Sequence, residues 1–363
     1  MTQPVPAKHA LCALALARPM QRLLAMKRLG RTPPFRAPNG DALAGSIAEI
    51  SYHSLGGLDQ WVLMRGASTA NPPLIMLHGG PGFSETSFFR YYNASLERSF
   101  TVVYWDQRGA GKSFTPHIPR ESMTLERFVA DLDELVEIVR TRLAQPKVVL
   151  FGHSWGSVLG SVYAARFPEK VAAYVGSGQI GDARAAESAS YAYALAEAER
   201  RGATSIARKL RAIGPPPYPA ASLWVERMSV SRLDGALRLR ALWKLGRMML
   251  ASKESSLREL PDSFRGFRWT IDVMWDETSR LNLCELAPAL AVPVFFFLGR
   301  NDHWVPLETS LAYFDMLRAP SKRLVVFERS GHEPFVDEAP AFDAAMVELV
   351  RPAVTSAAPL RAA

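Results

Sequence analysis

Cysteine is nearly absent from this sequence: Cys12 and Cys284 are the only two among 363 residues. Two cysteines cannot build a disulfide framework or a cysteine-based zinc site. Long apolar runs are missing as well, because no stretch approaches the ~20 apolar residues that a membrane-spanning helix needs. The sequence therefore excludes both kinds of cysteine site and offers no candidate membrane span.

Clustered charge of one sign is also lacking. The 43 basic residues outnumber the 35 acidic ones and give a net charge of +8, but they are scattered, without a long basic run or a basic-aromatic alternation. This scatter predicts no nucleic-acid partner. The composition, 48% hydrophobic and 21% charged, is that of an ordinary globular protein, and the chain is long enough for a large α/β core.

The N-terminal 46 residues contain the most apolar short segment, "ALCALALA" at 10–17, which Arg18 and Pro19 follow at once. This apolar core is at the short end for a signal peptide, and the segment after it is basic and weakly amphipathic. We expect residues 1–46 to form a surface helix or an extension of a cytoplasmic protein. The alternative is peripheral membrane contact or export through this segment. The alanine-rich residues 353–363 are expected to form a tail.

From residue 47 onward, strand patterns alternate with helix patterns. Two strand-like stretches flank Gly56-Gly57, and the apolar spacing over 124–143 predicts a helix with Thr124 as its N-cap. Short apolar runs predict further strands at 72–80, 99–107, 146–154, 170–179, 291–299 and 322–330. Helices are expected over 84–98, 156–168, 306–318 and 338–351. The alternation predicts an α/β fold, with a mostly parallel sheet and helices on both faces.

Residues 181–285 interrupt this alternation. They are rich in Ala, Arg, Leu and Glu, are broken by "IGPPPYP", and contain no strand pattern. An insertion of about a hundred residues between two strands predicts an inserted helical cap over the active edge of the sheet. The core is then formed by residues 47–180 and 286–352.

The stretch "WDQRGAGKSF" at 105–114 imitates the end of a phosphate-binding loop. Such a loop requires Gly-x-x-x-x-Gly-Lys-Ser/Thr, and the position of its first glycine is occupied by Asp106. A helix should follow directly, whereas Ser113 leads into "FTPHIPRES", which contains two prolines. The stretch is therefore not a nucleotide site.

A Gly-x-Ser-x-Gly pattern, "GHSWGS" at 152–157, lies between a predicted strand and a predicted helix. This context is typical of a nucleophile elbow, the turn that raises a serine hydroxyl above the sheet edge. The glycines leave room for tight packing around a residue with an unfavourable backbone conformation. Ser154 is the predicted nucleophile, and the alternative is a serine that caps an ordinary helix.

A serine nucleophile requires a base, and the base requires an acid that orients it. Of the two histidines after Ser154, His332 follows a predicted strand, and Asp302 follows the strand before it. Both fall on the carboxyl edge of the sheet, where α/β proteins place their sites. His303 competes weakly for the base role, because it neighbours Asp302 and would point away, and Glu333 competes weakly for the acid role.

Acyl transfer also requires donors for the oxyanion. The turn "LHGGPG" at 77–82 follows a strand and precedes the elbow, so the Gly80 N–H is predicted as one donor and the Trp155 N–H as the other. Gly79 is the substitute for Gly80. We expect His78 to brace this turn rather than to transfer protons.

Together these motifs resemble the α/β-hydrolase fold and, within it, the proline iminopeptidase family. The resemblance rests on "HGGPG" at 78–82, "DQRGAGKS" at 106–113 and "GHSWGS" at 152–157, followed by Asp302 and His332. It covers most of residues 47–350 and implies a serine hydrolase without a metal or organic cofactor. It also implies that the 106–113 loop shapes the floor of the site and that Lys112 is incidental.

The resemblance further implies an aminopeptidase that acts on a short peptide or a small amide. Family members are expected to hold the substrate's amino group with acidic residues of the cap. Here Glu187 and Glu226 are offered, although each also fits a solvated helix position. An alternative is a carboxylesterase with the same triad under an apolar cap containing Trp224, Met228, Trp243, Met248 and Met249. A third possibility is a non-catalytic binding protein of the same fold.

Overall fold

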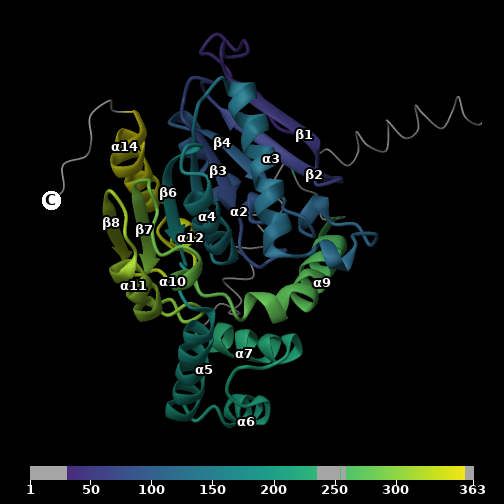
Figure 1. Ribbon diagram of the computed structural model, residues 1–363, viewed down its shortest axis with the longest axis vertical. Helices are drawn as coiled ribbons and strands as arrows, with labels where there is room; N and C mark the ends of the chain where they lie inside the picture. The colour runs from purple at the N-terminus through teal and green to yellow at the C-terminus, as the bar shows by residue number, and fades with distance from the viewer. Residues whose placement is uncertain (1–30, 235–253, 255–258, 356–363) are drawn as a thin grey trace, which may run out of the picture.

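The computed structural model describes residues 31–234, 254 and 259–355. Its centre is one eight-stranded sheet in the order β1-β2-β4-β3-β5-β6-β7-β8 (Figure 1). The first two strands form an antiparallel hairpin, β2 is antiparallel to β4, and the remaining neighbours are parallel. The bounds are β1 Ile47–Leu55, β2 Leu58–Gly66, β3 Pro73–Leu77, β4 Thr101–Trp105, β5 Val148–His153, β6 Val171–Ser177, β7 Val294–Gly299 and β8 Lys322–Phe327.

Helices cover both faces of the sheet, as the sequence pattern predicts. The side chains of α3 (Leu125–Leu143), α4 (Trp155–Arg166) and α11 (Leu307–Met316) contribute to the core on one face. The core on the other face contains residues of α2 (Thr86–Tyr92), α12 (Pro334–Asp337) and α13 (Ala339–Ala345), and of the π-helical turn Met346–Val350, which α14 (Arg351–Thr355) follows. The Thr124 side chain accepts a hydrogen bond from the Arg127 N–H, which confirms the predicted N-cap of α3.

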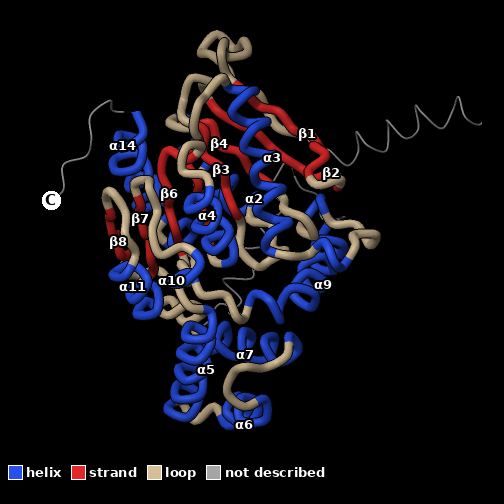
Figure 2. Tube along the Cα trace, in the orientation of Figure 1, coloured by secondary structure: helices blue, strands red, loops and turns tan. Residues whose placement is uncertain are grey.

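The chain between β6 and β7 contributes helices but no strand within its described residues (Figure 2). These are α5 (Ala183–Arg200), α6 (Thr204–Ile213), α7 (Ala220–Leu233), α9 (Leu260–Thr278) and α10 (Leu283–Leu286), here called the helical insertion. Figure 1 shows α5, α6 and α7 together below the sheet. Trp243, Met248 and Met249 lie outside the described residues, as do residues 1–30 and 356–363. None of the helices in the described ranges has the length and apolar character needed to cross a bilayer.

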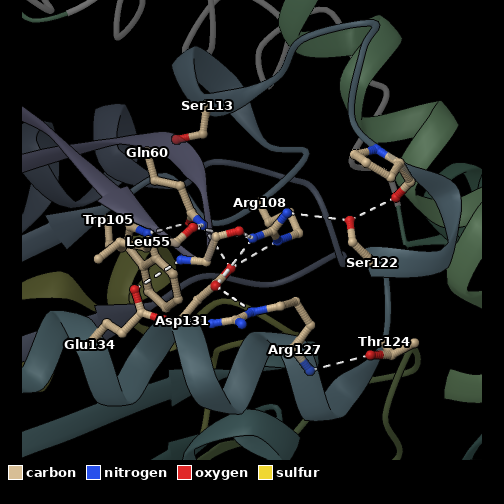
Figure 3. Close-up of polar contacts among 12 residues, drawn as sticks. Leu55, Gln60, Trp105, Arg108, Ser113, Ser122, Thr124, Arg127, Asp131 and Glu134 are labelled. Carbon is tan, nitrogen blue, oxygen red and sulfur yellow. Dashed lines mark hydrogen bonds and ion pairs between the residues drawn. The ribbon is translucent and has the colours of Figure 1, made fainter.

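A buried polar network ties the 106–113 loop to α3 and to the β1–β2 hairpin (Figure 3). Asp131 of α3 is fully buried and accepts hydrogen bonds from Arg108 at 2.9 Å, Gln60 at 2.7 Å and Arg127 at 2.8 Å. Arg108 also donates to the Leu55 carbonyl at 3.2 Å. Arg108 and Gln60 therefore anchor the loop and the hairpin to α3.

The donors of the same loop that would contact a phosphate have partners within the protein. The Asp106 carboxylate fills its interior, where it accepts the Lys112 N–H at 2.9 Å and the Ser84 hydroxyl. The Lys112 ammonium lies 4.5 Å from the centre of the Trp61 ring and pairs with Glu259 at 3.2 Å. Backbone and lysine donors that would cradle a phosphate are thus already engaged, which agrees with the failed glycine pattern.

Candidate active site

Ser154 occupies the turn between β5 and α4 with φ +52° and ψ −118°, a backbone conformation that non-glycine residues rarely adopt. Its flanking glycines are required by close contacts. A Cβ at Gly156 would lie 1.9 Å from the Leu77 carbonyl oxygen, and one at Gly152 would lie 2.4 Å from the Gly156 oxygen. The strand-to-helix turn thus has the geometry of a nucleophile elbow.

Asp302 and His332 form a buried pair beside this turn. Asp302 follows β7, His332 follows β8, and the Nδ1 atom of His332 lies 2.8 Å from Oδ2 of Asp302. The other carboxylate oxygen accepts the N–H groups of Trp304 and Val305, each at 2.9 Å. Because Nδ1 is bonded to Asp302, Nε2 is the ring nitrogen that remains for proton exchange with another group. His332 and Ser154 line the same cavity.

The glycine turn after β3 reaches the same cavity. Gly80 has φ +114°, a value that strongly favours glycine, and both Gly79 and Gly80 line the cavity. A Cβ at Gly79 would lie 3.2 Å from the Ser154 Cβ. Trp155 begins α4, so its N–H has no acceptor within the helix. The structure therefore brings the predicted oxyanion donors, Gly80 and Trp155, to the neighbourhood of Ser154.

His78 braces the glycine turn. Its Nδ1–H donates to the Gly79 carbonyl at 2.9 Å, and its Nε2 accepts the Gln107 N–H at 3.0 Å. Burial lowers the pKa of His78, in keeping with this neutral form. The Gln107 side chain donates to the His78 carbonyl and accepts the indole N–H of Trp155 at 3.1 Å. Gln107, which the sequence analysis missed, thus links the glycine turn to the elbow.

The walls of the cavity are mostly apolar. The core and the helical insertion together contribute Phe83, Val158, Ile180, Leu223, Trp224, Met228, Phe267, Ile271, Trp275, Trp304 and Val305. The insertion therefore covers the elbow with aromatic and aliphatic side chains, and Trp224 and Met228 lie where the esterase alternative places them.

Glu187 and Glu226 are not solvated helix residues, so that interpretation is wrong. Glu187 is 8% exposed and lines the cavity, whereas Glu226 is fully buried behind it. Both form ion pairs with Arg227. Glu187 also accepts the Tyr218 hydroxyl at 3.1 Å, and burial raises its pKa although Arg227 opposes this. The helices α5 and α7 face one another through this cluster, in which two carboxylates share one guanidinium.

A second buried pair lies on the core side of the cavity. The His153 Nδ1 is 2.6 Å from Glu85 Oε1, and both side chains line the cavity. Glu333 lines it too, and burial raises its pKa. Three carboxylates, those of Glu85, Glu187 and Glu333, therefore line this cavity, and its lining includes one guanidinium, that of Arg227. This local excess of acidic groups contrasts with the net charge of +8 of the whole chain. The sequence analysis missed Glu85 and His153.

His303 is absent from the residues that line this cavity. Its ring stacks on Tyr193 with centroids 3.7 Å apart, and its Nδ1 lies 3.0 Å from Asp234. Of the two histidines that follow Ser154 in the chain, His332 is therefore the one that lines the cavity with it.

Comparison with known proteins agrees with this geometry. Residues 72–339 match the model of a family described as the alpha/beta hydrolase fold. The chain is similar to a probable aminopeptidase, YbaC of Bacillus subtilis (strain 168), with 33% identity over 300 residues, which cover 82% of this chain and 94% of the relative. It is 25% identical over 274 residues to a proline iminopeptidase of Heyndrickxia coagulans, covering 73% and 86% of the two chains. A proline iminopeptidase-related protein of Thermus thermophilus has a similar structure, with a TM-score of 0.61 at 19% identity, covering 85% of this chain and 99% of the other.

Proposed function

Because the chain belongs to the α/β-hydrolase fold family, among the relatives of proline iminopeptidases, we propose that it is a serine hydrolase that removes N-terminal residues from short peptides or amino-acid amides. One observation carries the proposal. His332, which is paired with Asp302, and the strained Ser154 turn line one cavity, which the predicted oxyanion donors also reach.

The reaction proceeds through an acyl-enzyme. Ser154 Oγ attacks the substrate carbonyl carbon while His332 Nε2 takes the hydroxyl proton, and Asp302 stabilises the resulting imidazolium. The N–H groups of Gly80 and Trp155 stabilise the tetrahedral oxyanion. Collapse of this intermediate breaks the C–N bond, and His332 returns the proton to the departing amine. A water molecule then releases the acyl group by the same steps.

The charges of the cavity support a cationic substrate. Its lining carries three carboxylates against the Arg227 guanidinium and the His153 ring, whose pKa is raised to about 9, so a free α-ammonium group finds an attractive field there. Glu187 is the proposed anchor for this group because it lines the cavity, and Glu226 supports it from behind through Arg227. The apolar walls suit the side chain of a hydrophobic or proline residue at the N-terminus of the substrate.

The apolar walls also support a second candidate, a carboxylesterase that uses the same three residues on a hydrophobic acyl ester. Such a substrate carries no ammonium group and gains nothing from Glu187. The two candidate functions therefore differ in whether the cavity carboxylates contribute to substrate binding.

The test compares prolyl, alanyl and leucyl arylamides with short and long nitrophenyl esters, using wild type and Ser154→Ala. Fast arylamide cleavage that the substitution abolishes supports the aminopeptidase. Ester cleavage with negligible arylamide cleavage contradicts it and favours the esterase. A fluorophosphonate probe addresses the binding-protein alternative, since a hydrolase is labelled at Ser154 and a protein with a misaligned triad reacts slowly or not at all.

A further inference from the structure

A second histidine lies against the ring of His332. The two ring centroids, of His153 and His332, are 4.6 Å apart, and His153 is almost completely buried. Its Nδ1 lies 2.6 Å from the Glu85 carboxylate, and its Nε2 lies 3.0 Å from the main-chain carbonyl oxygen of His332. Beside an ionised Glu85, both contacts of the ring are hydrogen-bond acceptors, so both ring nitrogens of His153 carry hydrogen. The geometry thus fits an imidazolium–carboxylate pair.

The surroundings of His153 stabilise this charge. Burial alone would lower the pKa of His153, but the charge of Glu85 and the hydrogen bond to it raise the pKa to about 9. Glu333 and the His332 carbonyl act in the same direction. The other titratable rings that face this group are that of His332 and that of His78. Burial lowers the pKa of His78.

The ion pair lies against the His332 loop, the Ser154 turn and the glycine turn. His153 precedes Ser154 in the chain and donates to the main chain of His332. The Glu85 carboxylate packs against the glycine turn, where a Cβ at Gly79 would lie only 2.9 Å from Oε1. Gly178 leaves the space in which the rings meet, because a Cβ there would lie 2.7 Å from the His332 ring and 3.3 Å from His153 Nε2.

We propose that the Glu85–His153 ion pair is a positioning device, which holds the loop of His332 in register with Ser154 through the His153 Nε2–H to His332 carbonyl bond. The proposal rests on the proposed function, in which His332 is the base. A charge-assisted hydrogen bond is roughly twice as strong as a neutral one. Displacement of the base loop from the elbow would break such a bond, so the pair opposes the misalignment that slows proton transfer.

A purely structural role explains the pair less well. Buried ion pairs add little net stability because the loss of hydration offsets their attraction. Here the Glu85 Oε2 atom is buried without a hydrogen-bond partner among the described residues, which is a further cost. A pair that is costly to bury and contacts the base loop, the elbow and the glycine turn is better explained by positioning.

The kinetic test is Glu85→Gln, which keeps the shape of the side chain and removes its charge. Without that charge His153 becomes neutral, and its Nε2–H bond to the His332 carbonyl loses the charge that strengthens it. We expect kcat to fall about 10- to 100-fold, the scale of a misplaced catalytic group, with KM within about twofold of wild type. Glu85→Asp, which retains the charge, should recover part of kcat. The matched comparison is Glu187→Gln, which removes another cavity carboxylate and should instead raise KM.

The spectroscopic test is independent of turnover. In ¹⁵N-histidine-labelled Ser154→Ala protein at about pH 8, below the raised pKa, His153 should give the nitrogen shifts of an imidazolium. The signal should be absent in the corresponding Glu85→Gln protein and retained in Glu187→Gln. A neutral His153 in the folded protein overturns the proposal even if Glu85→Gln does not fold.

The two proposals fail in different ways. If wild type hydrolyses its substrate and a folded Glu85→Gln variant keeps full kcat, the positioning role is wrong and the hydrolase assignment stands. If wild type neither hydrolyses the arylamides and esters nor reacts with fluorophosphonate, the proposed function fails and the positioning role falls with it.

Discussion

Asp302 Oδ2 lies 2.8 Å from His332 Nδ1, although 30 positions separate the two residues in the chain. The contact exists because β7 and β8 are parallel neighbours, so the loops after them leave the sheet at the same edge. The carboxylate is itself immobilised by two backbone N–H groups. This pair occupies Nδ1 and leaves Nε2 as the ring nitrogen of His332 that is free of Asp302.

Replacing that carboxylate by an amide should abolish most activity without unfolding the protein. In Asp302→Asn the geometry is kept, but the amide no longer stabilises the tautomer and the cation that the reaction needs. We expect kcat to fall by about 10⁴-fold, as for other triads of this kind. Steady-state kinetics measures the loss, and a circular dichroism spectrum like that of wild type shows that the fold is intact. A loss below tenfold would argue against the role of Asp302.

The strained backbone of Ser154 should be visible as a cost in stability. Glycine adopts φ +52° without strain, whereas serine and alanine do not. Both Ser154→Gly and Ser154→Ala remove the hydroxyl, so they differ mainly in backbone freedom. We expect Ser154→Gly to be the more stable of the two by about 1 kcal/mol, because relief of strain exceeds the entropy that glycine adds to the unfolded chain. Urea unfolding of the two variants tests this, and equal stabilities would mean that the turn is unstrained.

The ion pair of Glu85 and His153 should make stability depend on pH. The pKa of His153 is raised to about 9 from an ordinary value of 6.5, so between these values the folded protein binds more protons than the unfolded chain. The contribution of the protonated His153 to the free energy of unfolding is therefore complete below about pH 6.5 and is lost as the pH rises through about 9. One proton contributes a slope of at most about 1.4 kcal/mol per pH unit. Urea unfolding across this range should show that slope in wild type and a smaller one in Glu85→Gln.

The buried Arg108–Asp131 network should contribute far more to the free energy of unfolding than an exposed ion pair does. Arg108→Ala leaves the carboxylate of Asp131 buried with fewer donors, and we expect a loss of about 3–5 kcal/mol in the free energy of unfolding. The matched control is Arg265→Ala, which removes an ion pair to Asp262 whose side chains are about two-thirds exposed. That change should cost no more than about 1 kcal/mol. Similar losses in both variants would contradict the role assigned to the network.

The elements that local patterns define were predictable. Apolar runs predicted the strands, and the glycine spacing around Ser154 predicted the elbow, because both depend on neighbouring residues. The expected helix over 84–98 is instead α2 followed by a 3₁₀ turn, Ala94–Arg98. The break falls at Asn93, whose side chain is buried and donates to Asp343 at 2.8 Å. That partner lies 250 positions away, so no local pattern could reveal it.

The burial of the two candidate glutamates and the missed Glu85–His153 pair have the same explanation. Glu187 and Glu226 are buried because α5 and α7 pack so that Arg227 reaches both, and this depends on how two helices meet. The Glu85–His153 pair likewise joins the loop before α2 to the end of β5. In the sequence each of these residues is an ordinary polar position. The role of each depends on which residues lie near it in the folded protein.

The position of the helical insertion in the chain allows the substrate preference of such a protein to evolve separately from its chemistry. The insertion leaves the core after β6 and returns before β7, whereas Ser154 precedes it and Asp302 and His332 follow it. The three proposed catalytic residues and much of the cavity wall are thus encoded in separate blocks of the gene. Recombination that exchanged residues 181–285 could give a new substrate preference in one step and leave the reaction chemistry untouched.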